Sequence, residues 1–139
     1  MTVCEWLESI KKLDQLIKCK YEERERLIAI ATSVSSGALD GMPHSNTGTV
    51  PQKMQDAVVD LVMLEEEIAM LIKKYINERQ KIIDAIETLS AKEYGVLHRY
   101  YILYMTYEKI AEEMGISTVE VWRTKKKAEK NLEKFIGCN

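Results

Sequence analysis

Apolar side chains recur at alternating intervals of four and three residues along two long stretches of the chain. The first stretch runs from Val3 to about Ser36, and the second runs from Met54 to Leu89. A repeat of about 3.5 residues that is kept over several heptads is typical of helices that pack lengthwise against one another. The pattern therefore predicts two long helices, each ~50 Å in length at a rise of ~1.5 Å per residue.

The segment between the two stretches is rich in small, turn-forming residues. It reads SSGALDGMPHSNTGTV from Ser35 to Val50. This composition predicts that the two helices fold back as an antiparallel hairpin, with a loop over residues 35–51. Thr49 and Gln52 are spaced as a capping box around Pro51, which suits the first turn of the second helix.

Charged residues interrupt both apolar seams near their middles. Lys20 and Arg24 lie in the first seam, and Glu65–Glu67 lie in or beside the second. If the turn centres near residue 44, residues whose numbers sum to about 88 face each other in the hairpin. Pairing of these opposite charges would then fix the register of the two helices.

Two long amphipathic helices alone bury little apolar surface in a chain of 139 residues. We therefore expect a homo-oligomer, with a dimer favoured, that assembles through these helices. The alternative is a scaffold in which the two helices pack only within one chain, and both arrangements are consistent with the pattern.

Capping signals predict shorter helices in the last third of the chain. Ser90 with Glu93 and Ser117 with Glu120 are spaced as capping boxes. Thr106 can cap a further helix that has Glu108 in its first turn. The first of these helices is expected to stop near Tyr104 or Met105. The second is expected to cover Tyr107–Met114 and to end at Gly115, which favours a left-handed cap. The third is expected to run to about Ile136.

The last two of these helices follow the residue order of a tight helix-turn-helix. Ile110 and Val121 are expected in the core, and Ala111 is small where the two helices approach closely. Gly115 reverses the chain, and Ile116 fills the corner.

Charge differs between the two predicted domains of this all-α chain, the helical hairpin over residues 1–89 and the helix-turn-helix domain over residues 90–139. The whole chain has 20 basic and 22 acidic residues and a formal net charge of −2, which by itself argues against binding to phosphate. Residues 1–89 carry 11 basic and 15 acidic side chains, whereas residues 90–139 carry 9 and 7. The basic character therefore belongs to the second domain.

The second domain resembles region 4 of the sigma-70 family, the helix-turn-helix that reads promoter −35 elements, over the segment LSAKEYGVLHRYYILYMTYEKIAEEMGISTVEVWRTKKKAEKNLEKF. The whole chain also resembles a family of small sigma-like transcriptional regulators from phages and prophages of Gram-positive bacteria, whose loop contains G-M-P-H-S, here Gly41–Ser45. The resemblance implies a sequence-specific double-stranded DNA-binding regulator in the cytoplasm of a bacterial host, similar to activators of late phage genes. We expect the helical hairpin either to dimerise or to contact RNA polymerase.

Residues on the outer face of the last helix are the candidate DNA contacts. They are Ser117, Thr118, Val119, Trp122, Arg123, Lys125, Lys126, Lys127 and Lys130. Arg123 suits base readout because its planar fork matches the two acceptors of guanine, whereas the lysines suit phosphates. Sigma region 4 usually carries Arg and Glu where Thr118, Val119 and Trp122 stand here, so the −35 preference does not carry over. Trp122 either faces DNA or a protein partner, or it packs against the long helices.

No constellation for catalysis or metal binding is present in the sequence. Cys4, Cys19 and Cys138 form no C-x-x-C pair, and His44 and His98 are not spaced to complete a zinc site. Glycine loops for phosphates and hydrolase motifs are also absent. We therefore expect a protein that is not an enzyme and has no cofactor or metal. We expect no membrane span, because no apolar run approaches ~20 residues. We expect no signal peptide, because the N-terminal MTVCEWLESIKK lacks the basic-then-apolar order of one.

Two other functions fit the same residues. One is a DNA-packaging protein similar to a small terminase subunit, in which the helical arms build a ring. The other is a protein-interaction module whose helix-turn-helix binds RNA polymerase or a host factor instead of DNA. A ring-sized mass would favour the first, and the absence of salt-dependent binding to duplex DNA would favour the second.

Overall fold

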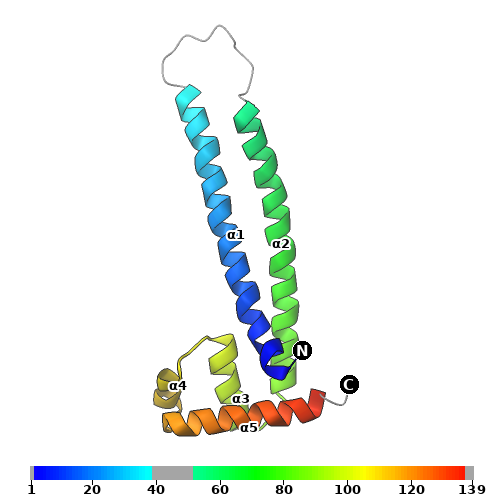
Figure 1. The fold of residues 1–139 in the computed structure, drawn as a ribbon, viewed down its shortest axis with the longest axis vertical. Helices are drawn as coiled ribbons and strands as arrows, with labels where there is room; N and C mark the ends of the chain where they lie inside the picture. The colour runs from blue at the N-terminus through cyan, green and yellow to red at the C-terminus, as the bar shows by residue number, and fades with distance from the viewer. Residues whose placement is uncertain (1, 39–51, 137–139) are drawn as a thin grey trace. The chain divides into compact units, whose positions relative to one another are not determined.

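The computed structural model describes residues 2–38 and 52–136, and every regular element in these residues is helical (Figure 1). The elements are α1 (Val3–Ala38), α2 (Gln52–Ile86), α3 (Ala91–Leu97), a π-helix η1 (His98–Ile102), α4 (Tyr107–Met114) and α5 (Thr118–Ile136). The predicted all-α fold is confirmed, although α1 continues past residue 35, where the loop was expected to begin. The rest of that loop, with Thr49, Pro51 and the Gly41–Ser45 motif, lies outside the described residues.

Contacts divide the chain into two compact units whose limits fall inside α1 and α2. The hairpin unit holds residues 15–73, and the head unit holds the residues up to 14 together with those from 74 onward. The first turns of α1 and the last turns of α2 therefore group with the C-terminal helices. The expected domain boundary after residue 89 does not coincide with this division.

Two ion pairs join α1 and α2 within the hairpin unit. Lys20 Nζ lies 3.0 Å from Glu67 Oε1, and Arg24 Nε donates a hydrogen bond to Glu65 Oε1 at 3.1 Å. The numbers of the paired residues sum to 87 and 89, which confirms the predicted register. All four side chains are partly exposed, so solvent screens these pairs and each contributes at most ~1 kcal/mol. Their main effect is therefore to fix the register of α1 against α2, and they stabilise the hairpin only slightly.

The hairpin unit buries few of its apolar side chains. Within residues 15–32 and 52–73, the buried ones are Ile17, Ala57, Leu64 and Ile68. Large apolar side chains that are exposed in the same residues are more numerous, namely Leu16, Tyr21, Val58, Val59, Val62, Met63 and Met70. A core this small stabilises two isolated helices only marginally.

The head unit is built around a core to which α1, α2, α3, η1 and α5 all contribute. Its buried side chains are Leu7, Ile10, Ile82, Ile86, Leu97, Tyr101, Ile102, Ala128 and Leu132. Leu7, Ile82 and Leu132 have no exposed surface, so the ends of both long helices are as deeply packed as α5. Full burial of one such side chain contributes ~1.5–3 kcal/mol.

A second core cluster joins α3, α4 and α5 within the head unit. Its buried members are Val96, Ile110, Ala111 and Val121. Ile110 and Val121 are fully buried, Ala111 lies in the contact, and Ile116 packs against the cluster as a half-buried side chain. The predicted packing of a helix-turn-helix is therefore confirmed for α4 and α5.

Hydroxyl side chains cap α3, α4 and α5 as the sequence predicts. The side-chain oxygens of Ser90, Thr106 and Ser117 accept hydrogen bonds from the backbone N–H groups of Glu93, Lys109 and Glu120. Gly115 ends α4 in the left-handed region, with φ 69° and ψ 33°, and its N–H donates to the carbonyl of Ala111. These caps set the residue at which each short helix begins or ends.

The structure differs from the sequence prediction at residues 98–102, where the helix widens into the π-helix η1. The backbone N–H of Leu103 donates to the carbonyl of His98, five residues back, at 3.1 Å. The neighbouring rings of Tyr100 and Tyr101 meet edge to face there, with centroids 4.8 Å apart. Periodicity does not reveal such a segment, because η1 ends the helix at Ile102 and no further apolar repeat follows that would show the added residue.

Replacing Gly115 with Ala should lower the free energy of unfolding by about 1–2 kcal/mol, because an L-residue is strained at a positive φ. The added Cβ would meet no atom within 4 Å, so the backbone conformation is the only source of the loss. Urea unfolding measures it, and Gly115→Asn should lose clearly less because Asn tolerates this region. Equal stability of Gly115→Ala and the native chain would contradict the left-handed cap.

Candidate nucleic-acid interface

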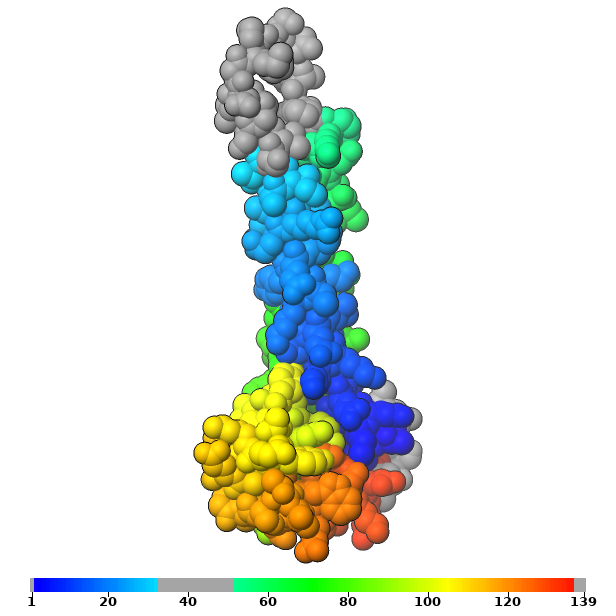
Figure 2. All heavy atoms as spheres, turned by 60° about the vertical axis from the view of Figure 1, so that its left-hand side comes forward, coloured from blue at the N-terminus to red at the C-terminus, as the bar shows by residue number. Residues whose placement is uncertain are grey.

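Helix α5 divides its side chains between the head-unit core and solvent. The buried inner face carries Val121, Thr124, Lys125, Ala128, Glu129 and Leu132. The exposed outer face carries Val119, Trp122, Arg123, Lys126, Lys127 and Lys130, with one exposed carboxylate, Glu133, further along the same side. Figure 2 shows α5, in orange and red, at the surface of the head unit beside α4. The structure thus brings the predicted contact residues together on one face, with Lys125 as the exception.

Ser117 and Thr118 lie at the N-terminal end of this face. Both are exposed, and the Ser117 hydroxyl accepts the backbone N–H of Glu120 at 3.1 Å. Ser117 therefore has a structural role as the cap of α5, and Thr118 is the first side chain of the helix.

Lys125 corrects the predicted set of contact residues. It is only 6% exposed, and its Nζ lies 2.6 Å from Glu129 Oε1 and 4.7 Å from the centroid of the Tyr100 ring. The prediction that Lys125 belongs to the outer basic run is wrong, because successive residues of a helix turn by ~100°. This rotation puts Lys125 on the inner face while Lys126 and Lys127 stay outside.

Glu129 is the centre of a polar cluster, the Glu129 cluster, formed with the buried Tyr101 and Lys125 and the half-buried Cys4. Besides its ion pair with Lys125, the carboxylate accepts hydrogen bonds from the Tyr101 hydroxyl at 2.6 Å and from the Cys4 thiol at 3.3 Å. The cluster connects the first turn of α1, the π-helix and α5 within the head unit. Its donors satisfy a charge that would be costly to bury alone.

The protonation states of the Glu129 cluster follow from these contacts. Burial acts to raise the pKa of Glu129, but the hydrogen bonds from Lys125 and Tyr101 outweigh burial and hold this pKa below its ordinary value of 4.5. Burial acts to lower the pKa of Lys125, but its bond to Glu129 raises this pKa above 10.5. Burial also raises the pKa of the Cys4 thiol and of Tyr101. At neutral pH the ion pair is charged and both other groups keep the protons that they donate.

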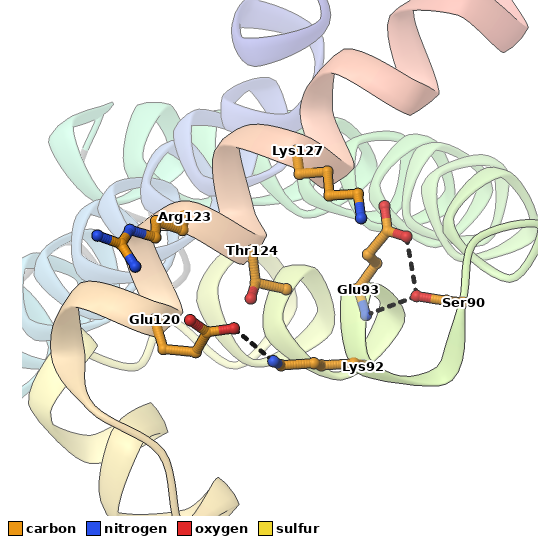
Figure 3. Close-up of a pocket in the computed structure, with 7 residues that line it drawn as sticks. All are labelled: Ser90, Lys92, Glu93, Glu120, Arg123, Thr124 and Lys127. Carbon is orange, nitrogen blue, oxygen red and sulfur yellow. Dashed lines mark hydrogen bonds and ion pairs between the residues drawn. The ribbon is translucent and has the colours of Figure 1, made fainter.

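A pocket lies beside α3 and α5, where side chains of both helices meet (Figure 3). Its lining residues are Ser90, Lys92, Glu93, Glu120, Arg123, Thr124 and Lys127. Lys92 Nζ lies 2.5 Å from Glu120 Oε1, and this hydrogen bond holds the pKa of Glu120 below its ordinary range. Glu93 accepts hydrogen bonds from the Ser90 hydroxyl and the Asn131 amide, both at 2.8 Å. Both carboxylates of the pocket are therefore engaged by donors.

Lys92 is a residue of this surface that the sequence analysis missed. It is 28 positions away from Glu120, and the pair forms only because α3 packs on α5. Glu120 was recognised as a capping residue, and its backbone N–H does bind Ser117, but its carboxylate reaches Lys92 instead of returning to the cap.

Trp122 lies on the outer face, with 49% of its surface exposed. Lys126 Nζ lies 6.0 Å from the centroid of its ring, which is a weak cation–π geometry. Of the two positions expected for Trp122, the structure agrees with the one in which the ring faces outward.

Among the described residues, His, Cys, Asp and Glu side chains nowhere gather in a group of three or more that could hold a metal ion. The helices formed by those residues also include none with the length and apolar character needed to cross a membrane.

Fold and site together define an all-helical protein in which a helix-turn-helix presents a cationic outer face. The family model described as "Protein of unknown function (DUF1492)" matches residues 33–133. Since this match covers more than half of the chain, the protein belongs to the DUF1492 family. Searches among curated proteins and among solved structures found no match to the chain.

Replacing Glu129 with Gln should lower the free energy of unfolding by about 3–5 kcal/mol at neutral pH, because it leaves the charge of Lys125 buried without its partner. The double variant Lys125→Met, Glu129→Leu should recover most of this loss, since it removes both charges. Chemical unfolding of the three chains measures the difference.

The same carboxylate should give the native chain a characteristic acid sensitivity. The pKa of Glu129 is lower in the folded protein than its ordinary value of 4.5, so its stabilisation is present above that value and is lost as the pH falls through the folded pKa. The double variant should show a shallower loss of stability in acid. Equal acid dependence of the two chains would contradict the charged state assigned to the pair.

Proposed function

We propose that the protein is a sequence-specific double-stranded DNA-binding transcriptional regulator of phage or prophage origin. The observation that carries the proposal is the outer face of α5, where Arg123, Lys126, Lys127 and Lys130 are exposed together. Cations gathered on one helix face attract phosphates. The inner face of the same helix is held by the head-unit core, so α5 presents these cations in a fixed orientation.

The first turns of α5 have dimensions that suit the major groove. An α-helix with its side chains is ~10–12 Å in diameter, which fits the ~12 Å width of that groove. In helix-turn-helix proteins, residues at the N-terminal end of the second helix lie nearest the base edges. Arg123 would there donate to guanine, and Lys126, Lys127 and Lys130 would contact phosphates.

The Lys92–Glu120 ion pair supports the same proposal. Glu120 lies in the first turn of α5, where an unpaired carboxylate would repel the DNA backbone. Lys92 neutralises this charge across the pocket at 2.5 Å and adds a contact between α3 and α5. The pair thus makes the electrostatic potential at the start of α5 less negative, and it helps to fix α5 against α3.

Oligomerisation is a further part of the proposal, with a second copy of the chain as the partner. The exposed side chains of Val58, Val59, Val62 and Met63 form an apolar patch on α2, here called the α2 patch. Within residues 15–32 and 52–73 the hairpin unit buries fewer apolar side chains than it exposes, so covering the α2 patch would supply the core that two helices lack. Dimeric helix-turn-helix proteins read two half-sites. Contact with RNA polymerase in the bacterial cytoplasm is proposed on the sigma-like resemblance alone.

The double variant Lys126→Gln, Lys127→Gln should reduce the salt dependence of binding to duplex DNA. Each lost phosphate contact lowers the slope of log affinity against log salt by roughly 0.9, so we expect a reduction of roughly 1.8. Fluorescence anisotropy with a duplex selected from host genomic DNA measures the slope. Lys11→Gln, Lys12→Gln is the matched control, because it removes the same charge from exposed positions of α1. Equal slopes for the two double variants would contradict contact through α5.

Replacing Val62 and Met63 with Glu should convert a dimer into a monomer, because two carboxylates would have to be buried in the contact. Sedimentation equilibrium of the native chain and the variant measures the mass. Asp60→Asn, at an exposed position of the same helix, should leave the dimer intact. A monomeric native chain at micromolar concentration would refute assembly through the α2 patch.

A further inference from the structure

Two large apolar side chains stand among the cations of the outer face. Val119 is 55% exposed and Trp122 is 49% exposed, and both lie in the first two turns of α5. At ~100° per residue, Trp122, Arg123 and Lys126 all project within ~60° of Val119 around the helix. The apolar pair is therefore part of the same face as the cations.

A face built only to attract phosphates has no use for such side chains. Phosphate oxygens are bound by Lys, Arg and polar donors, and an exposed Val and Trp at these positions contribute nothing to that attraction. Apolar side chains on a DNA-facing helix contact the one apolar group on the major-groove edges of the bases, the C5-methyl group of thymine. The charge of Arg123, Lys126, Lys127 and Lys130 is complementary to DNA around the pair, which favours nucleic acid over a neutral protein surface as its occupant.

The other side chains in the first two turns of α5 that could read a base are Glu120 and Arg123. Glu120 could accept a hydrogen bond from the amino group of cytosine, but its carboxylate is bound by Lys92 at 2.5 Å. Arg123 matches guanine. Readout of cytosine by a carboxylate is thereby disfavoured in this part of α5.

We infer that Val119 and Trp122 recognise the C5-methyl groups of thymine in the major groove, next to a guanine bound by Arg123. This inference rests on the proposed function, because it requires α5 to enter the groove. Removal of one methyl group from such a contact should weaken binding about fourfold.

Replacement of thymine by uracil in the DNA tests the inference, since the two bases differ only in that methyl group. Duplexes are first selected by the full-length protein from a random pool, and the selected pool is then copied with either thymidine or deoxyuridine nucleotides. The native chain should bind the thymine pool at least about fourfold more tightly. The variant Val119→Ala, Trp122→Ala should bind both pools equally, and thermal unfolding should show that it remains folded, since both side chains are exposed.

Lys126→Gln, Lys127→Gln is the matched control on the same face. It should bind both pools more weakly but keep the preference of the native chain for thymine. Equal binding of the two pools by the native chain would overturn the inference while leaving DNA binding intact. A preference that survives in Val119→Ala, Trp122→Ala would overturn it as well, because the methyl groups would then be read elsewhere. Absence of binding to either pool at low salt would overturn the proposed function itself.

Discussion

The ion pair between Lys125 and Glu129 is the contact on which the candidate interface depends. It lies on the inner face of α5, and the same carboxylate accepts hydrogen bonds from Tyr101 and Cys4. Separating two buried charges costs several kcal/mol, so α5 cannot turn about its axis to exchange Lys125 for a neighbouring lysine. The pair therefore specifies which cations of a continuous lysine run face outward, although it belongs to the core and not to the proposed contact surface.

The head unit that holds this pair is assembled from distant parts of the chain. Leu7 and Ile82 are fully buried in the same core as Leu132, and Cys4 donates to Glu129 across 125 positions. The last fifty residues contain the whole helix-turn-helix, but they lack the side chains of α1 and α2 that cover α5. The N-terminal residues are therefore structural components of the unit that carries the candidate interface. Charge and motif alone would assign that unit to the C-terminal part of the chain.

Local signals predicted much of this structure, and the two misses at Lys125 and Lys92 have different causes. Caps such as Ser90 and Gly115 act within four residues, so the sequence predicts them directly. The pairing of Lys20 with Glu67 was predictable because residues that face each other in an antiparallel hairpin have numbers with a nearly constant sum. Lys125 was misplaced because a run of lysines hides the helical period, and the Lys92–Glu120 pair depends on packing that no spacing encodes.

The distribution of charge limits how the outer face of α5 could attract DNA. A chain with a net charge of −2 gains no general attraction to DNA, and its net negative charge lies in the first 89 positions, which carry 15 acidic and 11 basic side chains. Attraction is then confined to a few exposed cations, each of which loses strength as salt rises. The specific binding that we propose would then depend in part on contacts that salt does not screen. Apolar contact with a base methyl group is of that kind, and it would give Val119 and Trp122 a physical reason to occupy positions where lysines could otherwise stand.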